Sequence, residues 1–112
     1  MITERSLKIP IYGFKLKIII FDDRKEIEEK YPEMDLYVGA TLEYHGGCTV
    51  IIPADDSATA VHECEHVKNA VWKFIGYKPH QTNDEVDAYL LTYIFTEIRK
   101  VVQKHFSLAT SC

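Results

Sequence analysis

Two histidines and a glutamate occupy the pattern H-E-x-x-H, in which His62 and His66 are four residues apart and Glu63 follows the first histidine. On a helix, residues four apart lie on one face about one turn apart, so both imidazoles can reach a single metal ion. Zinc accepts neutral imidazole nitrogens in a tetrahedral shell. Glu63 projects beside the metal, where it can take a proton from an activated water molecule and pass it to a leaving amine. The pattern therefore predicts one Zn²⁺ per chain, with His62 and His66 as ligands and Glu63 as general base.

A second acidic cluster opens the next predicted helix and contains Asp84, Glu85 and Asp87. A helix–loop–helix can fold this helix start back against the first helix, so that one carboxylate completes a site of two histidines and one acid. Such a site leaves one position open for water, as catalytic zinc requires. Asp84 is alternatively a helix cap or a first-turn acid that favours the helix dipole. Asp87 alternatively accepts the free N–H of a ligating histidine.

Three further residues near these motifs have expected roles. Tyr89 follows Glu85 by one turn. It is expected either to hydrogen-bond an oxyanion or a metal-bound water, or to be a core or half-buried tyrosine. Cys64 lies on a different helical face from the histidines and is expected to be a buried, small apolar residue. His105, near the C-terminus, is expected at the surface.

The elements that must position these residues divide the chain into two halves. The first half has strand patterns at residues 7–12, 15–21, 36–44 and 48–52, with a short charged helix between the second and third. His45-Gly46-Gly47 predicts a hairpin between the last two strands. The second half has a helical pattern that starts at the cap signals of residues 55–57 and runs to about Ile75, where Gly76 ends it. A second pattern runs from near residue 83 to about residue 104.

This order predicts an α+β fold. We expect one domain over residues 1–112, with a mixed sheet of three or four strands, a hairpin at its edge, and two long C-terminal helices that carry the metal site.

Composition excludes several classes of protein. The chain has 112 residues, with 46% hydrophobic and 27% charged residues, which is ordinary globular composition. Its formal net charge of −4 disfavours a nucleic-acid binder. No apolar run approaches the roughly 20 residues that span a bilayer, so no membrane segment is expected. An odd cysteine count of 3 argues against a disulfide framework, and together with the lack of a signal-peptide pattern at the N-terminus it favours the cytoplasm.

The motif His62-Glu63-x-x-His66, followed by Glu85-x-x-Ala88, resembles the gluzincin branch of zinc metallopeptidases. It is most similar to the small cytoplasmic ImmA/IrrE type, and also resembles compact metallopeptidases encoded by bacteriophages and prophages. The resemblance covers residues 48–95. It implies a zincin-like, minimal gluzincin domain, with zinc held by His62, His66 and Glu85 and with Glu63 as base. It also implies a sheet whose edge strand holds an extended peptide, and the host cytoplasm as location if the chain is phage-encoded.

The first hypothesis is therefore a zinc-dependent metallopeptidase that hydrolyses a peptide bond in a narrow protein substrate. One alternative is a zinc-binding, catalytically silent accessory or inhibitor protein that acts by binding a partner protein. Another is a metal-free structural domain in which the motif is accidental.

Overall fold

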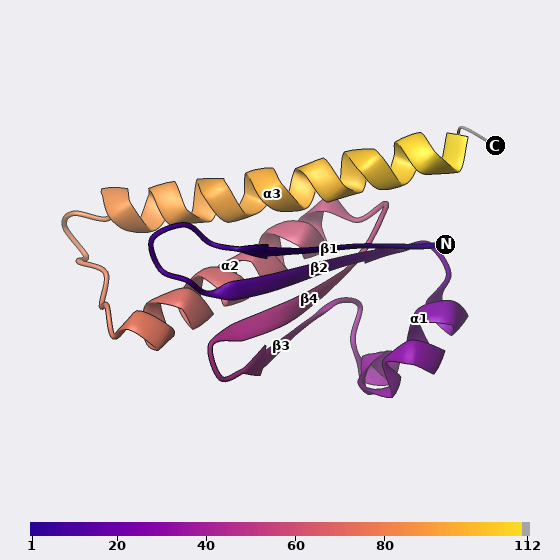
Figure 1. Ribbon diagram of the computed structural model, residues 1–112, viewed down its shortest axis with the longest axis horizontal. Coiled ribbons are helices and arrows are strands. Elements are labelled where there is room, and N and C mark those ends of the chain that lie inside the picture. The colour runs from indigo at the N-terminus through magenta and orange to yellow at the C-terminus, as the bar shows by residue number, and fades with distance from the viewer. Residues whose placement is uncertain (111–112) are drawn as a thin grey trace.

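The computed structural model describes residues 1–110, with the side chains of residues 35 and 36 outside that description. Four strands form one mixed sheet in the order β1-β2-β4-β3 (Figure 1). β1 (Ile2–Lys8) pairs antiparallel with β2 (Lys15–Phe21), β2 pairs parallel with β4 (Gly47–Pro53), and β4 pairs antiparallel with β3 (Ala40–Tyr44). The predicted α+β class, the mixed sheet and the hairpin at the edge of the sheet are confirmed, and β3 is an edge strand.

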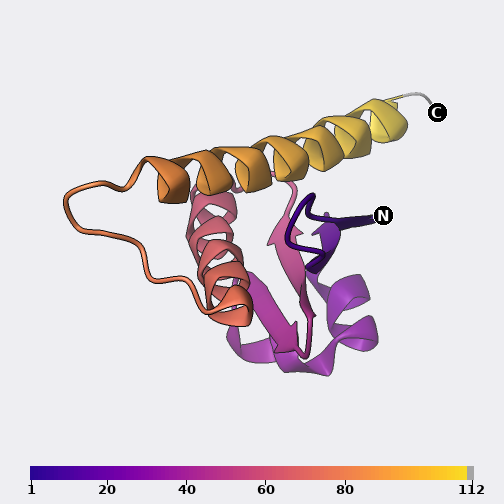
Figure 2. The ribbon, with the colours of Figure 1, turned by 60° about the vertical axis from the view of Figure 1, so that its left-hand side comes forward.

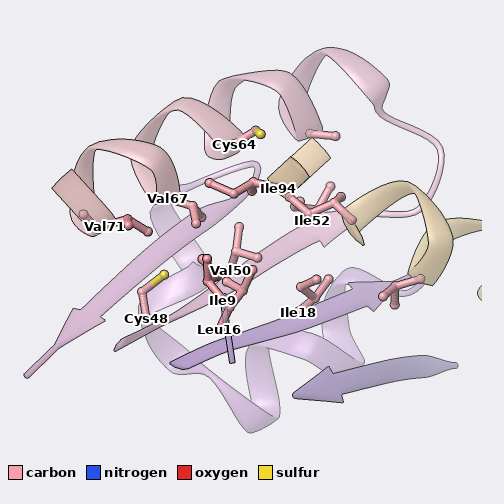
Figure 3. Packing of buried hydrophobic residues seen from close by; sticks show 14 of the residues in the cluster. Ile9, Leu16, Ile18, Cys48, Val50, Ile52, Cys64, Val67, Val71 and Ile94 are labelled. Atoms are coloured by element: carbon pink, nitrogen blue, oxygen red, sulfur yellow. The ribbon is translucent and has the colours of Figure 1, made fainter. Parts of the chain in front are cut away.

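The two central strands are buried on both faces. Ile18 and Ile20 of β2 lie on the same face as Val50 of β4, beneath α2 (Ser57–Ile75) and α3 (Glu85–Thr110). Figure 3 shows this layer, in which Val67, Val71 and Ile94 of the helices pack on strand residues. The opposite face buries a smaller cluster against α1 (Arg24–Lys30) and the 3₁₀ helix η1 (Pro32–Leu36), namely Ile19, Phe21, Ile27, Met34, Ala40 and Ile51. Helices therefore cover both faces of the sheet (Figure 2).

Local signals at its two ends determine the length of α2. The N-cap is Asp56, whose side chain accepts a hydrogen bond of 2.9 Å from the backbone N–H of Thr59. At the other end Gly76 adopts the left-handed conformation, with φ 73°, that glycine reaches without steric cost. The predicted helix, which ends at about Ile75 with Gly76 as its stop, is confirmed.

An ion pair joins α2 to the first turn of α3. The ammonium of Lys68 lies 2.9 Å from both Glu65 and Asp87, and its side chain is only 8% exposed. The other oxygen of Asp87 accepts a hydrogen bond of 2.6 Å from the indole N–H of Trp72. The start of α3 is thus fixed on the face of α2 that carries Lys68 and Trp72. In residues 1–110, no helix combines the length and apolarity needed to cross a membrane.

Three predicted boundaries are wrong. The first strand is Ile2–Lys8 instead of residues 7–12, because it forms a complete antiparallel ladder with β2 that its polar sequence does not reveal. β3 begins at Ala40 instead of residue 36, because Arg24 donates hydrogen bonds to the backbone oxygens of Met34, Tyr37 and Val38 and holds that segment in a turn. The last helix extends to Thr110.

His105 is buried, contrary to the prediction of a surface position. Its Nδ1 lies 2.7 Å from Oγ1 of Thr3, and its Nε2 lies 2.8 Å from a carboxylate oxygen of Asp22. Because both ring nitrogens have partners, the polar ring can be buried between α3 and the sheet.

We expect the Lys68–Asp87 pair to make stability depend on pH. Burial disfavours the charged form of Asp87, but hydrogen bonds from Lys68 and Trp72 outweigh that effect and hold its pKa below the usual value. A carboxyl with a lowered pKa contributes stability above its unfolded pKa of about 4, and this contribution is lost as pH falls through the folded value. Asp87→Asn should therefore reduce the free energy of unfolding at pH 7 by about 1–3 kcal/mol, and should lose less than wild type on acidification.

The measurement is urea denaturation at several pH values between 7 and 3. Asp55→Asn, which removes an exposed carboxylate, is the matched control and should behave as wild type. If the free energy of unfolding of Asp87→Asn fell with decreasing pH as steeply as that of wild type, the pH dependence would not come from Asp87.

Candidate metal centre

Four residues of α2 form a stripe that faces the edge strand β3. Thr59, His62, Glu63 and His66 have the spacing i, i+3, i+4, i+7, which places them on one side of a helix. With the segment from Tyr37 to Glu43 they line a groove of about 740 Å³. The H-E-x-x-H motif therefore lies at the junction of a helix and an edge strand.

The two histidines are exposed on this stripe, with their rings against one another. Nε2 of His62 lies 3.3 Å from Nε2 of His66, and the ring centroids are 4.9 Å apart. Two imidazole ligands at 2.0–2.1 Å from one tetrahedral zinc ion must have their nitrogens about 3.3 Å apart. The pair thus fits two adjacent positions of a zinc site.

Glu63 is buried, with only 4% of its surface exposed. One of its carboxylate oxygens accepts a hydrogen bond of 3.0 Å from Oγ1 of Thr41, which belongs to β3. The carboxylate therefore has a defined position in the groove beside the histidines. A buried carboxylate held by a single hydroxyl retains unused acceptor positions, which are needed to receive a proton.

Gly39 allows the chain to approach α2 closely just before β3 begins. A Cβ at this position would lie 2.6 Å from Cγ2 of Thr59 and 2.9 Å from the backbone oxygen of Ile51, both too short for real contacts. The lack of a side chain at Gly39 therefore allows the start of β3 to pack closely against the stripe of α2.

The structure does not bring the predicted third ligand to the histidines. Asp87 contacts Lys68, which lies two residues after His66 and hence on another face of α2. Glu85 is exposed at the first position of α3, and neither it nor Asp84 lines the groove. Among the side chains that the structure describes, no three from His, Cys, Asp and Glu gather as a metal site. Glu85 as third ligand stays a prediction.

The alternative role of Asp87, as acceptor of a histidine N–H, stays a prediction, because the structure gives this carboxylate other partners. Its two oxygens are bonded to Lys68 and Trp72. Glu65 pairs with the same lysine and not with a histidine.

Tyr89 and Cys64 have clear positions. Tyr89 is 70% exposed, so it is neither a core nor a half-buried tyrosine. It is not among the groove residues, and its contact with an oxyanion or a metal-bound water stays a prediction. Cys64 is buried, as predicted, and its thiol lies 3.6 Å from the backbone oxygen of Leu91. Burial raises the pKa of the Cys64 thiol to about 12, which makes it unreactive at neutral pH.

Two groove residues were missed from the sequence. Thr59 could have been found, because it precedes His62 by three residues and Glu63 by four on the same helical stripe. Thr41 carries no such signal, since its contact with Glu63 depends on how β3 packs against α2.

The groove thus combines a histidine pair with metal-ligand spacing, a buried carboxylate and an edge strand. Comparisons with protein-family models, with curated proteins and with solved structures gave no match to this chain.

Proposed function

We propose that the protein is a zincin-like, zinc-dependent metallopeptidase that hydrolyses a peptide bond in a narrow protein substrate. The observation that carries this proposal is the 3.3 Å separation of the His62 and His66 Nε2 atoms beside buried Glu63. The i, i+4 spacing brings the two rings together, and the buried carboxylate of Glu63 beside them adds the acid that a zinc peptidase needs. Their position next to an edge strand adds a means to hold a peptide.

His62 and His66 would hold the metal, with Glu85 as third protein ligand on the gluzincin resemblance. When bound, zinc polarises a carbonyl group and favours deprotonation of water near neutral pH. The spacing of the two imidazole nitrogens supports this assignment.

Glu63 supplies the proton transfers. As a water oxygen forms a bond to the scissile carbonyl carbon, the Glu63 carboxylate takes a proton from that water. It then gives the proton to the amide nitrogen as the C–N bond breaks, and the second proton of the water passes to the released amine, so the products are a carboxylate and an ammonium group. The hydrogen bond from Thr41 orients the carboxylate for both steps.

β3 aligns the substrate. An edge strand presents unpaired backbone N–H and C=O groups, to which an extended peptide adds as a further strand. Since β3 lines the same groove as the histidines, a peptide bound to it would pass over Glu63.

A second candidate is a zinc-binding accessory protein without catalytic activity. The absence of a third His, Cys, Asp or Glu at the histidine pair, among the side chains described, favours it. Zinc would then hold an interaction surface in shape, and the groove would bind a partner without cleaving it.

We expect about one zinc per chain after zinc loading and dialysis. His62→Ala or His66→Ala should abolish retention, because a site that has lost one of its histidines does not hold zinc against an ordinary chelator. His80→Ala removes an exposed loop histidine and should retain the metal. Elemental analysis measures the content, and full retention by the double variant His62→Ala/His66→Ala would refute the site.

Glu85 should contribute to zinc affinity, whereas Asp84 should not. Loss of a protein ligand in Glu85→Gln should weaken zinc binding by at least about tenfold, while Asp84→Asn should bind as wild type. Competition with a chromophoric chelator gives both affinities. A larger loss of zinc affinity in Asp84→Asn than in Glu85→Gln would identify Asp84 as the ligand. Equal affinity of all three proteins would exclude both acids as zinc ligands.

Glu63→Gln tests catalysis separately from metal binding. Glutamine keeps the shape and still accepts the hydrogen bond from Thr41, but it cannot take a proton from water. We expect unchanged zinc content, unchanged fold and a loss of about 10²–10⁴ in rate. The variant should therefore retain from a cell lysate a partner that wild type releases as fragments.

The comparison is made by mass spectrometry of proteins captured by wild type and Glu63→Gln in parallel. Intact capture of the same partner in equal amount by both proteins would eliminate the peptidase and leave the accessory protein.

A further inference from the structure

The two ends of the groove differ in chemistry. At one end, Tyr37 and Val38 expose 57% and 60% of their surfaces. At the other end is the carboxylate of Glu43, and none of the described residues that line the groove between them is a lysine or an arginine. The wall along β3 therefore changes from apolar to acidic.

Glu43 points to the same side of β3 as Thr41. The two residues pair with Cys48 and Val50 of β4, which belong to the core layer beneath α2. Since alternate residues of a strand share a face and lie about 6.6 Å apart, Glu43 stands one side-chain position along the groove from the Thr41–Glu63 contact.

The carboxylate of Glu43 is accessible. Its one ion-pair partner among the described side chains, Lys73, is 3.9 Å away and 81% exposed, and Glu43 itself is 48% exposed. An ion pair at this distance and exposure is weak, so a cation of a bound peptide can displace Lys73.

We propose that Glu43 is a specificity-determining residue, and that the substrate is an extended peptide with lysine or arginine at one fixed position within three residues of the scissile bond. The basic side chain pairs with Glu43, and the peptide side chain on the other side of the cut contacts Tyr37 and Val38. Cross-strand neighbours of opposite charge stabilise strand pairing. This inference rests on the proposed function, because it needs a peptide bound along β3.

The experiment uses zinc-loaded wild type, Glu43→Lys and a matched control, Glu29→Lys, which makes the same charge change in an exposed residue beside Ile2 and Glu4 at the opposite edge of the sheet. Each protein is incubated with chymotryptic peptides of a whole proteome, which retain internal Lys, Arg, Asp and Glu. Mass spectrometry of the new termini gives the residue frequencies around each cut. Circular dichroism confirms that the variants are folded.

We expect basic residues at one position to exceed acidic residues by about fivefold, the usual upper range for an exposed ion pair, in wild type and in Glu29→Lys. Glu43→Lys should lose or reverse this preference. Cleavage without a charge preference, or with the same preference in Glu43→Lys, would overturn the inference and leave the proposed function intact. If the zinc-loaded wild type cleaves neither these peptides nor any protein captured by Glu63→Gln, the proposed function is overturned, and the inference with it.

A binding measurement provides a second readout. The best-cleaved sequence is synthesised with Lys or Glu at the selected position and titrated against Glu63→Gln and Glu63→Gln/Glu43→Lys by fluorescence anisotropy. The Lys peptide should bind Glu63→Gln about fivefold more tightly than the Glu peptide, and the double variant should remove this difference. Equal affinities of both peptides for Glu63→Gln would contradict the pairing with Glu43.

Discussion

β2 and β4 pair in parallel, and their inner residues from Ile18 to Ile20 and from Val50 to Ile52 are buried on both faces. A parallel pair of this kind is stable only when both faces are covered. The chain satisfies that requirement with α2 and α3 on one face and with α1 and η1 on the other. Since β4 continues almost directly into α2, the same pairing decides where the H-E-x-x-H motif lies.

The site follows from this arrangement by two short steps. A turn at His45-Gly46 connects β3 to β4, and the antiparallel pairing of these strands places β3 at the edge of the sheet. The N-cap at Asp56 fixes where α2 begins, and the packing of its core residues on the sheet leaves the stripe from Thr59 to His66 facing that edge. The lack of a side chain at Gly39 permits the close approach. The carboxylate of Glu63 is therefore largely shielded from water and held by the Thr41 hydroxyl, yet it still lines the groove.

The sequence predicted what depends on local order. The hairpin, the cap and length of α2, the buried Cys64 and the convergence of His62 and His66 all follow from periodicity and from Gly, Pro and Asp signals. What it did not predict depends on tertiary packing. β1 has a polar sequence and forms a strand because it pairs with β2. The burial of His105 needs Thr3 and Asp22, which are distant in sequence, and the contact of Thr41 with Glu63 needs the packing of β3 on α2.

The first turn of α3 contains both Asp87, which contacts α2, and Glu85, the predicted zinc ligand, and the two residues require different orientations of the helix. Asp87 is held by Lys68 and Trp72, and residues two apart on a helix point in nearly opposite directions. The contact that fixes α3 on α2 therefore turns Glu85 away from α2, and α3 cannot rotate to present Glu85 without breaking that contact. Glu85 is, however, the first residue of the helix, and the initial N–H groups of a helix have no partner within it. A change of backbone conformation at this position would break the bond from Ala88 N–H to the Asp84 oxygen. Zinc capture by Glu85 is thus compatible with an intact Lys68–Asp87 pair only if the helix start unwinds locally and Asp87 stays in place.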